Sequence, residues 1–160
     1  MQRLAIYYTP PPDSELAVTA SAWLGRDVYG NKSSKTVVVD GLSQRRRAEL
    51  VSSPSHYGFH ATIKPPFQLR KEKSVQALKQ KLRQFAGAWH GLVLPPLQIS
   101  FMQDFFCLRP SVCCPPLVNL AAEAIHHFAD FGKAPAKGEL EKRRKAGLTP
   151  LQESLLRIWG

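Results

Sequence analysis

One stretch constrains the fold more than any other, a run from Gly58 to Lys64 in which polar and apolar residues alternate. Alternate residues of a β-strand point to the same face. If the run is extended, one side carries an imidazole, a hydroxyl and an ammonium group, from His60, Thr62 and Lys64. The other side is apolar and suits a core, with Phe59, Ala61 and Ile63. We expect the strand to end at Pro65-Pro66, because proline cannot donate to a strand ladder.

Strand and helix signals divide the rest of the chain in an order that predicts an α+β fold. Runs rich in strand-forming residues occupy residues 3–8, 92–94, 97–101 and 105–108, the last two as a hairpin around Gln103-Asp104. Apolar residues at helical spacing follow capping residues at four places, namely Asp13 or Ser14, Ser43, Ser74 and Thr149. A further helix is expected over residues 117–128.

The length of 160 residues predicts a single domain, and a hydrophobic fraction of 44% is enough for a core. No apolar run approaches the ~18 residues that a membrane-spanning helix needs. The N-terminal run is too short for a secretory signal, since Pro10 interrupts it early. We therefore expect a cytoplasmic protein with no membrane partner.

The three cysteines, Cys107, Cys113 and Cys114, are expected to be free, buried thiols. An odd count with two adjacent residues forms no disulfide framework, and no Cys-x-x-Cys pair indicates a zinc site. The sequence also lacks a glycine-rich phosphate loop, a Gly-x-Ser-x-Gly motif and a His-Glu-x-x-His motif. From these absences we expect that the protein uses neither a metal nor another cofactor.

A formal net charge of +10 indicates an anionic partner. Much of the excess lies in Arg45–Arg47, Arg70–Lys81 and Lys142–Lys145, of which the first two have the character of solvated helix faces. No aromatic RNA-binding signature accompanies these charges. A small phosphate ester explains the sign of the charge as well as a polynucleotide does, and an RNA end remains open as a substrate.

The chemistry of the polar side suits a phosphate ester. A histidine can move a proton to or from an ester oxygen, while a hydroxyl and a cation can hold the non-bridging oxygens. One His-x-Thr taken alone is more often structural than catalytic. Gly58, two residues before His60, favours a functional role for this histidine, because a missing side chain lets another group approach closely.

Four segments resemble an uncharacterised bacterial family of phosphonate-metabolism proteins within the two-histidine (2H) phosphoesterase superfamily. They are Arg3–Pro12, Trp23–Asp27, Tyr57–Lys64, and Leu148–Pro150 together with Arg157–Gly160. The resemblance implies two pseudo-symmetric lobes of antiparallel sheet with outer helices, each lobe supplying one His-x-Thr/Ser motif. It implies that His60 transfers a proton and that Thr62 holds the phosphate, while strand alternation adds Lys64 as a phosphate-binding charge. Related enzymes act on cyclic phosphates without a metal.

The chain departs from that family because it holds only one such motif. The residues two positions after the other four histidines are Gly58, Leu92, Phe128 and Ala129, so none begins a second motif. Family members continue beyond the equivalent of Gly160, and we expect residues 1–160 to be a C-terminally truncated domain with an incomplete second lobe. The resulting hypothesis is a metal-independent phosphoesterase impaired by truncation. It acts on a cyclic phosphate or phosphodiester of a ribose, nucleotide or phosphonate-derived metabolite. The alternative is a non-catalytic basic RNA- or nucleotide-binding remnant.

Overall fold

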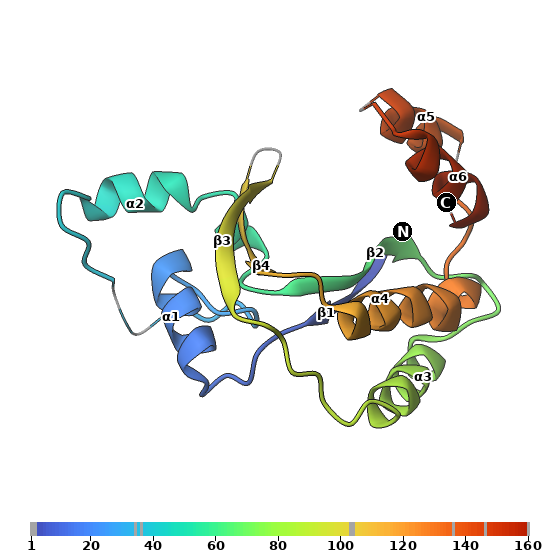
Figure 1. The fold of residues 1–160 in the computed structure, drawn as a ribbon, viewed down its shortest axis with the longest axis horizontal. Helices are drawn as coiled ribbons and strands as arrows, with labels where there is room; N and C mark the ends of the chain where they lie inside the picture. The colour runs from blue at the N-terminus through green and yellow to red at the C-terminus, as the bar shows by residue number, and fades with distance from the viewer. Residues whose placement is uncertain are drawn as a thin grey trace. The chain divides into compact units, whose positions relative to one another are not determined.

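A computed structural model describes residues 3–33, 35, 37–102, 105–135, 137–145 and 147–159. The chain is an α+β protein with two small antiparallel sheets (Figure 1). Its strands are β1 Arg3–Tyr8, β2 Ala61–Gln68, β3 Leu97–Met102 and β4 Phe105–Pro110. Its α-helices are α1 Glu15–Leu24, α2 Gln44–Leu50, α3 Val75–Gly87, α4 Pro115–Phe128, α5 Lys137–Lys145 and α6 Pro150–Trp159. Two 3₁₀ turns, η1 Pro54–His56 and η2 Ala129–Phe131, complete the described elements.

The chain divides into two compact units, Ala5–Pro65 and Met1–Leu4 with Pro66–Gly160. The boundary crosses both β1 and β2, which pair with each other. Each unit is described by itself below. The prediction of one domain over residues 1–160, with two pseudo-symmetric lobes, stays a prediction.

The unit Ala5–Pro65 contains most of β1, the first residues of β2, α1 and α2. The expected helix caps are confirmed, because the hydroxyls of Ser14 and Ser43 accept hydrogen bonds from Ala17 and Arg46 backbone amides. Arg47 of α2 donates to the backbone carbonyls of Ala22 and Trp23 at the end of α1, which ties the helices together. The buried apolar residues of this unit are Ile6, Ala22 and Val51.

The other unit has its core between α3 and α4, which lie side by side in Figure 1. Phe128 is completely buried, and its ring meets the ring of Phe85 edge-on at 5.3 Å. Phe67 of β2 is also buried and lies against Gly132, where a Cβ would be 3.5 Å from the Phe67 ring. The hydroxyl of Ser74 caps α3 as expected.

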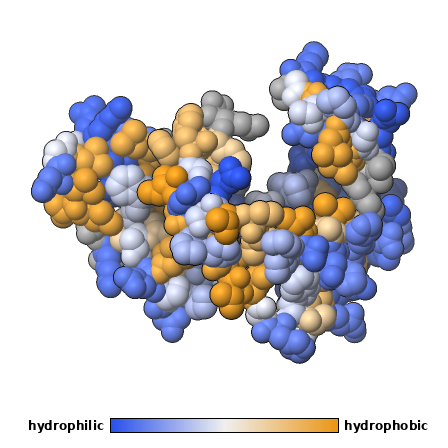
Figure 2. Space-filling model, in the orientation of Figure 1, coloured by the Kyte–Doolittle hydropathy of each residue, from blue (hydrophilic) through white to orange (hydrophobic). Residues whose placement is uncertain are grey.

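The β3–β4 hairpin confirms two of the predicted strands. Its register pairs Ile99 with Leu108 and Phe101 with Phe106, so one face of the hairpin is wholly apolar. This face is largely exposed, and hydrophobic side chains of the hairpin are visible at the surface in Figure 2. The predicted turn at Gln103-Asp104 lies outside the described residues.

Three expectations from the sequence are wrong. Residues 92–94 form no strand, and Val93 is 94% exposed. β2 does not end at the two prolines but continues through them to Gln68. Of the cysteines, all of which are free, only Cys114 is buried, while Cys107 is partly exposed and Cys113 is exposed.

Only one of the two adjacent prolines can point its missing N–H toward the edge of β2 that lies away from β1, where it breaks no bond of the ladder. The other removes one donor toward β1, so the pairing of β2 with β1 continues with one hydrogen bond fewer. The guanidinium of Arg3 also donates to the Pro66 carbonyl oxygen at 2.9 Å.

Candidate active site

His60 lies immediately before β2, where a contact with the backbone fixes its ring. Its Nδ1 is 2.9 Å from the carbonyl oxygen of Gly58. A carbonyl oxygen only accepts hydrogen bonds, so we assign the proton of this contact to Nδ1. In a neutral ring, Nε2 then keeps its lone pair and can accept a proton from water or a hydroxyl. This is the tautomer that a general base at Nε2 requires.

Aromatic rings further restrict the imidazole. The ring centroid of Tyr7 in β1 lies 4.0 Å from that of His60 at an interplanar angle of 37°. Tyr57 approaches from the preceding segment, with centroids 6.3 Å apart. His60 is nevertheless only half-buried. The ring is therefore oriented by its neighbours and still reachable from solvent.

Gly58 is required by its surroundings as well as by its backbone conformation. It has φ +72°, and a Cβ built on it would lie 2.7 Å from Cα of Val28. The backbone nitrogen of Val28 would be 3.0 Å away, so no side-chain rotation could relieve the clash. The prediction that Gly58 permits a close approach is confirmed, and the approaching group is the backbone of Val28.

Thr62 and Lys64 are two residues apart in β2, so their side chains leave the same face of the strand. Thr62 is exposed and Lys64 is half-buried. Burial lowers the pKa of the Lys64 ammonium group, because desolvation disfavours its charge. On the opposite face Ala61 is exposed and Ile63 half-buried, so the expected core contact of this face is incomplete. The assignment of His60, Thr62 and Lys64 to a phosphate site stays a prediction.

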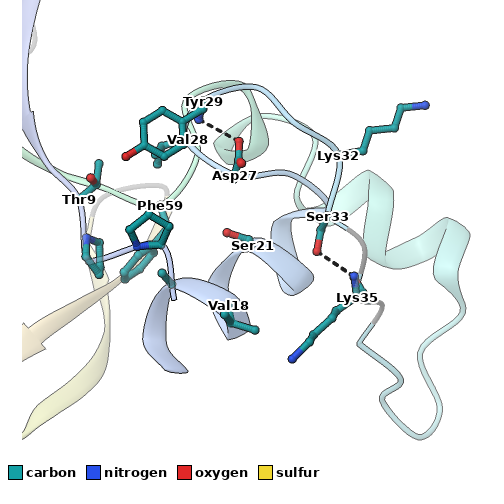
Figure 3. A pocket seen from close by; sticks show the side chains of 13 residues that line it. Thr9, Val18, Ser21, Asp27, Val28, Tyr29, Lys32, Ser33, Lys35 and Phe59 are labelled. Atoms are coloured by element: carbon teal, nitrogen blue, oxygen red, sulfur yellow. Dashed lines mark hydrogen bonds between the residues drawn. The ribbon is translucent and has the colours of Figure 1, made fainter. Parts of the chain in front are cut away.

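A pocket of about 230 Å³ lies beside this segment in the same unit (Figure 3). Phe59 belongs to its lining, whereas the neighbouring His60 does not. The other lining residues come from the segment after β1, from α1 and from the loop after α1, and they include Thr9, Val18, Ser21, Asp27, Val28, Tyr29, Lys32, Ser33 and Lys35. The pocket is therefore separate from the His60 ring.

Asp27 organises the loop that borders this pocket. One carboxylate oxygen accepts hydrogen bonds from the backbone amides of Tyr29 and Asn31, both at 2.9 Å, and the other accepts from the Asn31 side chain at 2.8 Å. The Asn31 side-chain hydrogen bond and the backbone amides lower the pKa of Asp27. This loop was not among the site residues predicted from the sequence. The Asp-x-x-Gly-Asn pattern was the available signal, because Asp side chains commonly accept from amides two residues on.

The other unit contains a basic groove lined by Arg3, Gly138, Lys142 and Arg143. Arg144 points elsewhere, because its guanidinium forms a bidentate pair with Glu153 of α6 at 2.8 to 3.2 Å. That contact raises the pKa of Arg144 and lowers the pKa of Glu153. The cations of α5 thus divide between an ion pair and a groove.

Two further observations concern the described residues alone. His, Cys, Asp and Glu side chains in the described ranges form no group of three that could hold a metal ion. Within the same ranges, no helix combines the length and apolar character needed to cross a membrane.

Comparison with known proteins places these features in context. The family described as "Protein of unknown function (DUF1045)" matches residues 62–160. A protein of Janthinobacterium sp. (strain Marseille), named ribose 1,5-bisphosphate phosphokinase PhnN, is 35% identical over all of this chain and 35% of its own length. A Laribacter hongkongensis (strain HLHK9) protein with the same name is 33% identical over 99% of this chain and 36% of its own length. The chain thus spans about a third of these relatives. No solved structure matches it.

Proposed function

The chain belongs to the DUF1045 family, and from this membership and the geometry of His60 we propose that it is a phosphoesterase acting on a ribose-based phosphate ester. The observation that carries the proposal is the 2.9 Å contact between His60 Nδ1 and the Gly58 carbonyl oxygen. It leaves Nε2 as the ring nitrogen for proton transfer. The relatives' names, which specify a ribose bisphosphate, support the substrate class.

In the proposed reaction His60 Nε2 takes a proton from the attacking water or hydroxyl. The Thr62 hydroxyl donates to a non-bridging oxygen of the phosphate, and the Lys64 ammonium balances the negative charge that develops there. The reaction opens a cyclic phosphate or cleaves a phosphodiester, and it uses no metal ion. An anion beside Lys64 favours the charged amine and so opposes the lowering of its pKa by burial.

The leaving oxygen also needs a proton, and this requirement limits the expected rate. None of the other four histidines begins a second His-x-Thr/Ser motif. A positioned acid or base typically contributes ~10²–10⁴-fold, so we expect this chain alone to be slower by about that factor than an enzyme with both groups.

The phosphokinase activity in the relatives' names is not extended to this chain, which spans about a third of those proteins. The segment Gly25–Ser33 is close to a nucleotide phosphate loop, Gly-x-x-x-x-Gly-Lys-Ser/Thr, but has Asn31 inserted before the lysine. In a phosphate loop the backbone amides bind the nucleotide's phosphates. Here the Asp27 carboxylate already takes the amides of Tyr29 and Asn31. We infer that the kinase activity belongs to the remainder of the relatives.

The test is hydrolysis of a panel of 2′,3′-cyclic nucleotides and a ribose cyclic phosphate in the presence of EDTA. Wild type is compared with His60→Ala, and with His56→Ala as a matched control from the same unit. We expect His60→Ala to lose turnover by about 100-fold or more while His56→Ala keeps it. Equal rates in folded wild type and His60→Ala would overturn the proposal.

The basic groove favours a second candidate, binding of RNA without catalysis. Arg3, Lys142 and Arg143 give its lining positive charge. Binding of a single-stranded RNA oligonucleotide, followed by fluorescence anisotropy, should weaken steeply with salt and survive His60→Ala. Lys142→Glu should weaken it more than Lys145→Glu, which changes the same charge on α5 outside the groove. Equal effects of Lys142→Glu and Lys145→Glu on RNA affinity would show that the groove is not the RNA-binding site.

A further inference from the structure

The pocket beside Phe59 has the size of a single-ring ligand. Its volume is about 230 Å³, below the ~300–1,000 Å³ of pockets for larger ligands. It is built from one compact unit, between α1, the loop after it and the segment before β2. Its shape therefore depends on contacts inside Ala5–Pro65.

The lining combines an apolar wall with hydroxyl groups. Val18, Val28 and Phe59 provide aliphatic and aromatic surface, and Ser21 and Thr9 carry hydroxyls (Figure 3). Neither hydroxyl has a side-chain hydrogen-bond partner among the residues that the structure describes. A ligand ring packed on the apolar wall could thus use both hydroxyls to bind its own polar groups.

The charge of the lining is positive, with two lysines and one aspartate. Asp27 is engaged by the amides of its own loop, as described above. Lys35 extends back toward Val18 along the pocket, whereas Lys32 points outward in Figure 3. Ser33 holds the backbone of Lys35, because its hydroxyl both donates to the Lys35 carbonyl oxygen and accepts from the Lys35 amide. Lys35 is therefore the cation placed to meet an anionic group.

We propose that this pocket is a second ligand site, distinct from His60, which binds a small organic phosphate. The sugar or other ring lies against Val28 and Phe59, and the phosphate meets the Lys35 ammonium at the rim. Ser21 and Thr9 bind hydroxyls of the ring. Both parts of the ligand are needed, because neither the cation nor the small apolar wall alone provides strong binding.

The test is a titration of the full chain carrying His60→Ala with ribose 5-phosphate, followed by calorimetry and by amide chemical shifts. His60→Ala is expected to lose the proposed hydrolysis, so binding to the pocket can be measured in this variant without turnover at His60. We expect saturable binding with shifts concentrated at Ser21, Val28 and Tyr29. Shifts confined to Thr62 and Lys64, or no saturable binding, would overturn the proposal.

Two substitutions sharpen the result. Lys35→Met keeps the aliphatic stem and removes the charge, and it should raise the Kd for ribose 5-phosphate about tenfold or more. Lys32→Met is the matched control and should change the Kd less than about threefold, because its side chain points away. Equal effects of the two variants would contradict the assignment of Lys35.

Ser21→Leu fills the pocket from α1 and should abolish binding. If this variant fails to fold, the two lysine variants still decide the question. Inorganic phosphate and ribose serve as partial ligands, and each should bind more weakly than ribose 5-phosphate. If inorganic phosphate bound as tightly as ribose 5-phosphate, the pocket would recognise only an anion. If ribose bound as tightly as ribose 5-phosphate, the Lys35 charge would not contribute to binding. Either result would overturn the proposal.

Discussion

The carbonyl oxygen of Gly58 holds Nδ1 of His60 at 2.9 Å, while Gly58 itself lies too close to Val28 to carry a side chain. One residue thus fixes the imidazole and admits the neighbouring loop. Any change at Gly58 should affect stability and the orientation of His60 together.

Gly58→Ala should destabilise the protein more than Gly41→Ala. Both glycines have positive φ, +72° and +77°, but nothing lies within 4 Å of a Cβ at Gly41. We expect about 1–2 kcal/mol for Gly41→Ala from backbone strain alone. The clash with Val28 should add about 1–3 kcal/mol at Gly58. Urea unfolding monitored by circular dichroism measures the free energy of unfolding of both variants. Equal decreases in Gly58→Ala and Gly41→Ala would mean that Val28 moves aside without an energetic penalty.

Tyr7→Leu should loosen the His60 ring. The two ring centroids are 4.0 Å apart, and aromatic contacts of this kind contribute ~0.5–1.5 kcal/mol beyond burial. Tyr8→Leu is the control, since Tyr8 is the next residue of β1 and is 57% exposed. Ring-proton NMR of His60 should show averaging in Tyr7→Leu only. An unchanged His60 spectrum in Tyr7→Leu would show that the Gly58 contact alone orients the ring.

Lys64 should make stability rise with pH in the alkaline range. Burial lowers the pKa of Lys64 in the folded chain below its ordinary value of 10.5, so the unfolded chain binds this proton more tightly. Between the folded and unfolded pKa values, the free energy of unfolding therefore increases with pH. Lys64→Met should remove the increase, and Lys79→Met on α3 should keep it. The measurement is urea unfolding between pH 7 and 10.5, and a rise that persists in Lys64→Met would assign it to another group.

Asp27 should stabilise its loop only while ionised. Its pKa is lowered, chiefly by the Asn31 side chain, so its contribution is complete above the ordinary pKa of 3.8. The contribution is lost as pH falls through the lower, folded pKa. Wild type should thus be more stable than Asp27→Asn at pH 6, and the difference should shrink under acid conditions. Thermal unfolding at several pH values tests this, and a difference that does not depend on pH would mean that the carboxylate charge is not involved.

Local signals predicted much of the fold. Ser14, Ser43 and Ser74 cap helices through the hydroxyl contacts that their positions suggest, and Thr149 caps α6 in the same way. Such caps depend on residues a few positions apart, so the sequence displays both partners. Gly58 was likewise identified from its place before the strand, although its partner Val28 lies 30 residues away.

Other features depend on partners that no local pattern reveals. Residues 92–94 are apolar enough for a strand, but Pro95 and Pro96 follow them and no strand pairs with them among the described residues. The pocket beside Phe59 was missed because its lining is gathered from four separate segments. The sequence of β2 predicted that the strand would end at its two prolines. In the structure β2 pairs with β1 and continues through them.

That passage through Pro65 and Pro66 has a consequence for self-association. Successive residues of a strand direct their N–H groups to opposite edges, so two adjacent prolines remove one donor from each edge. A strand from another molecule that approached the open side of β2 would find one donor missing within the Pro65-Pro66 segment. Fibrillar growth by strand addition is therefore disfavoured at that point, next to the residues that we propose to bind the phosphate.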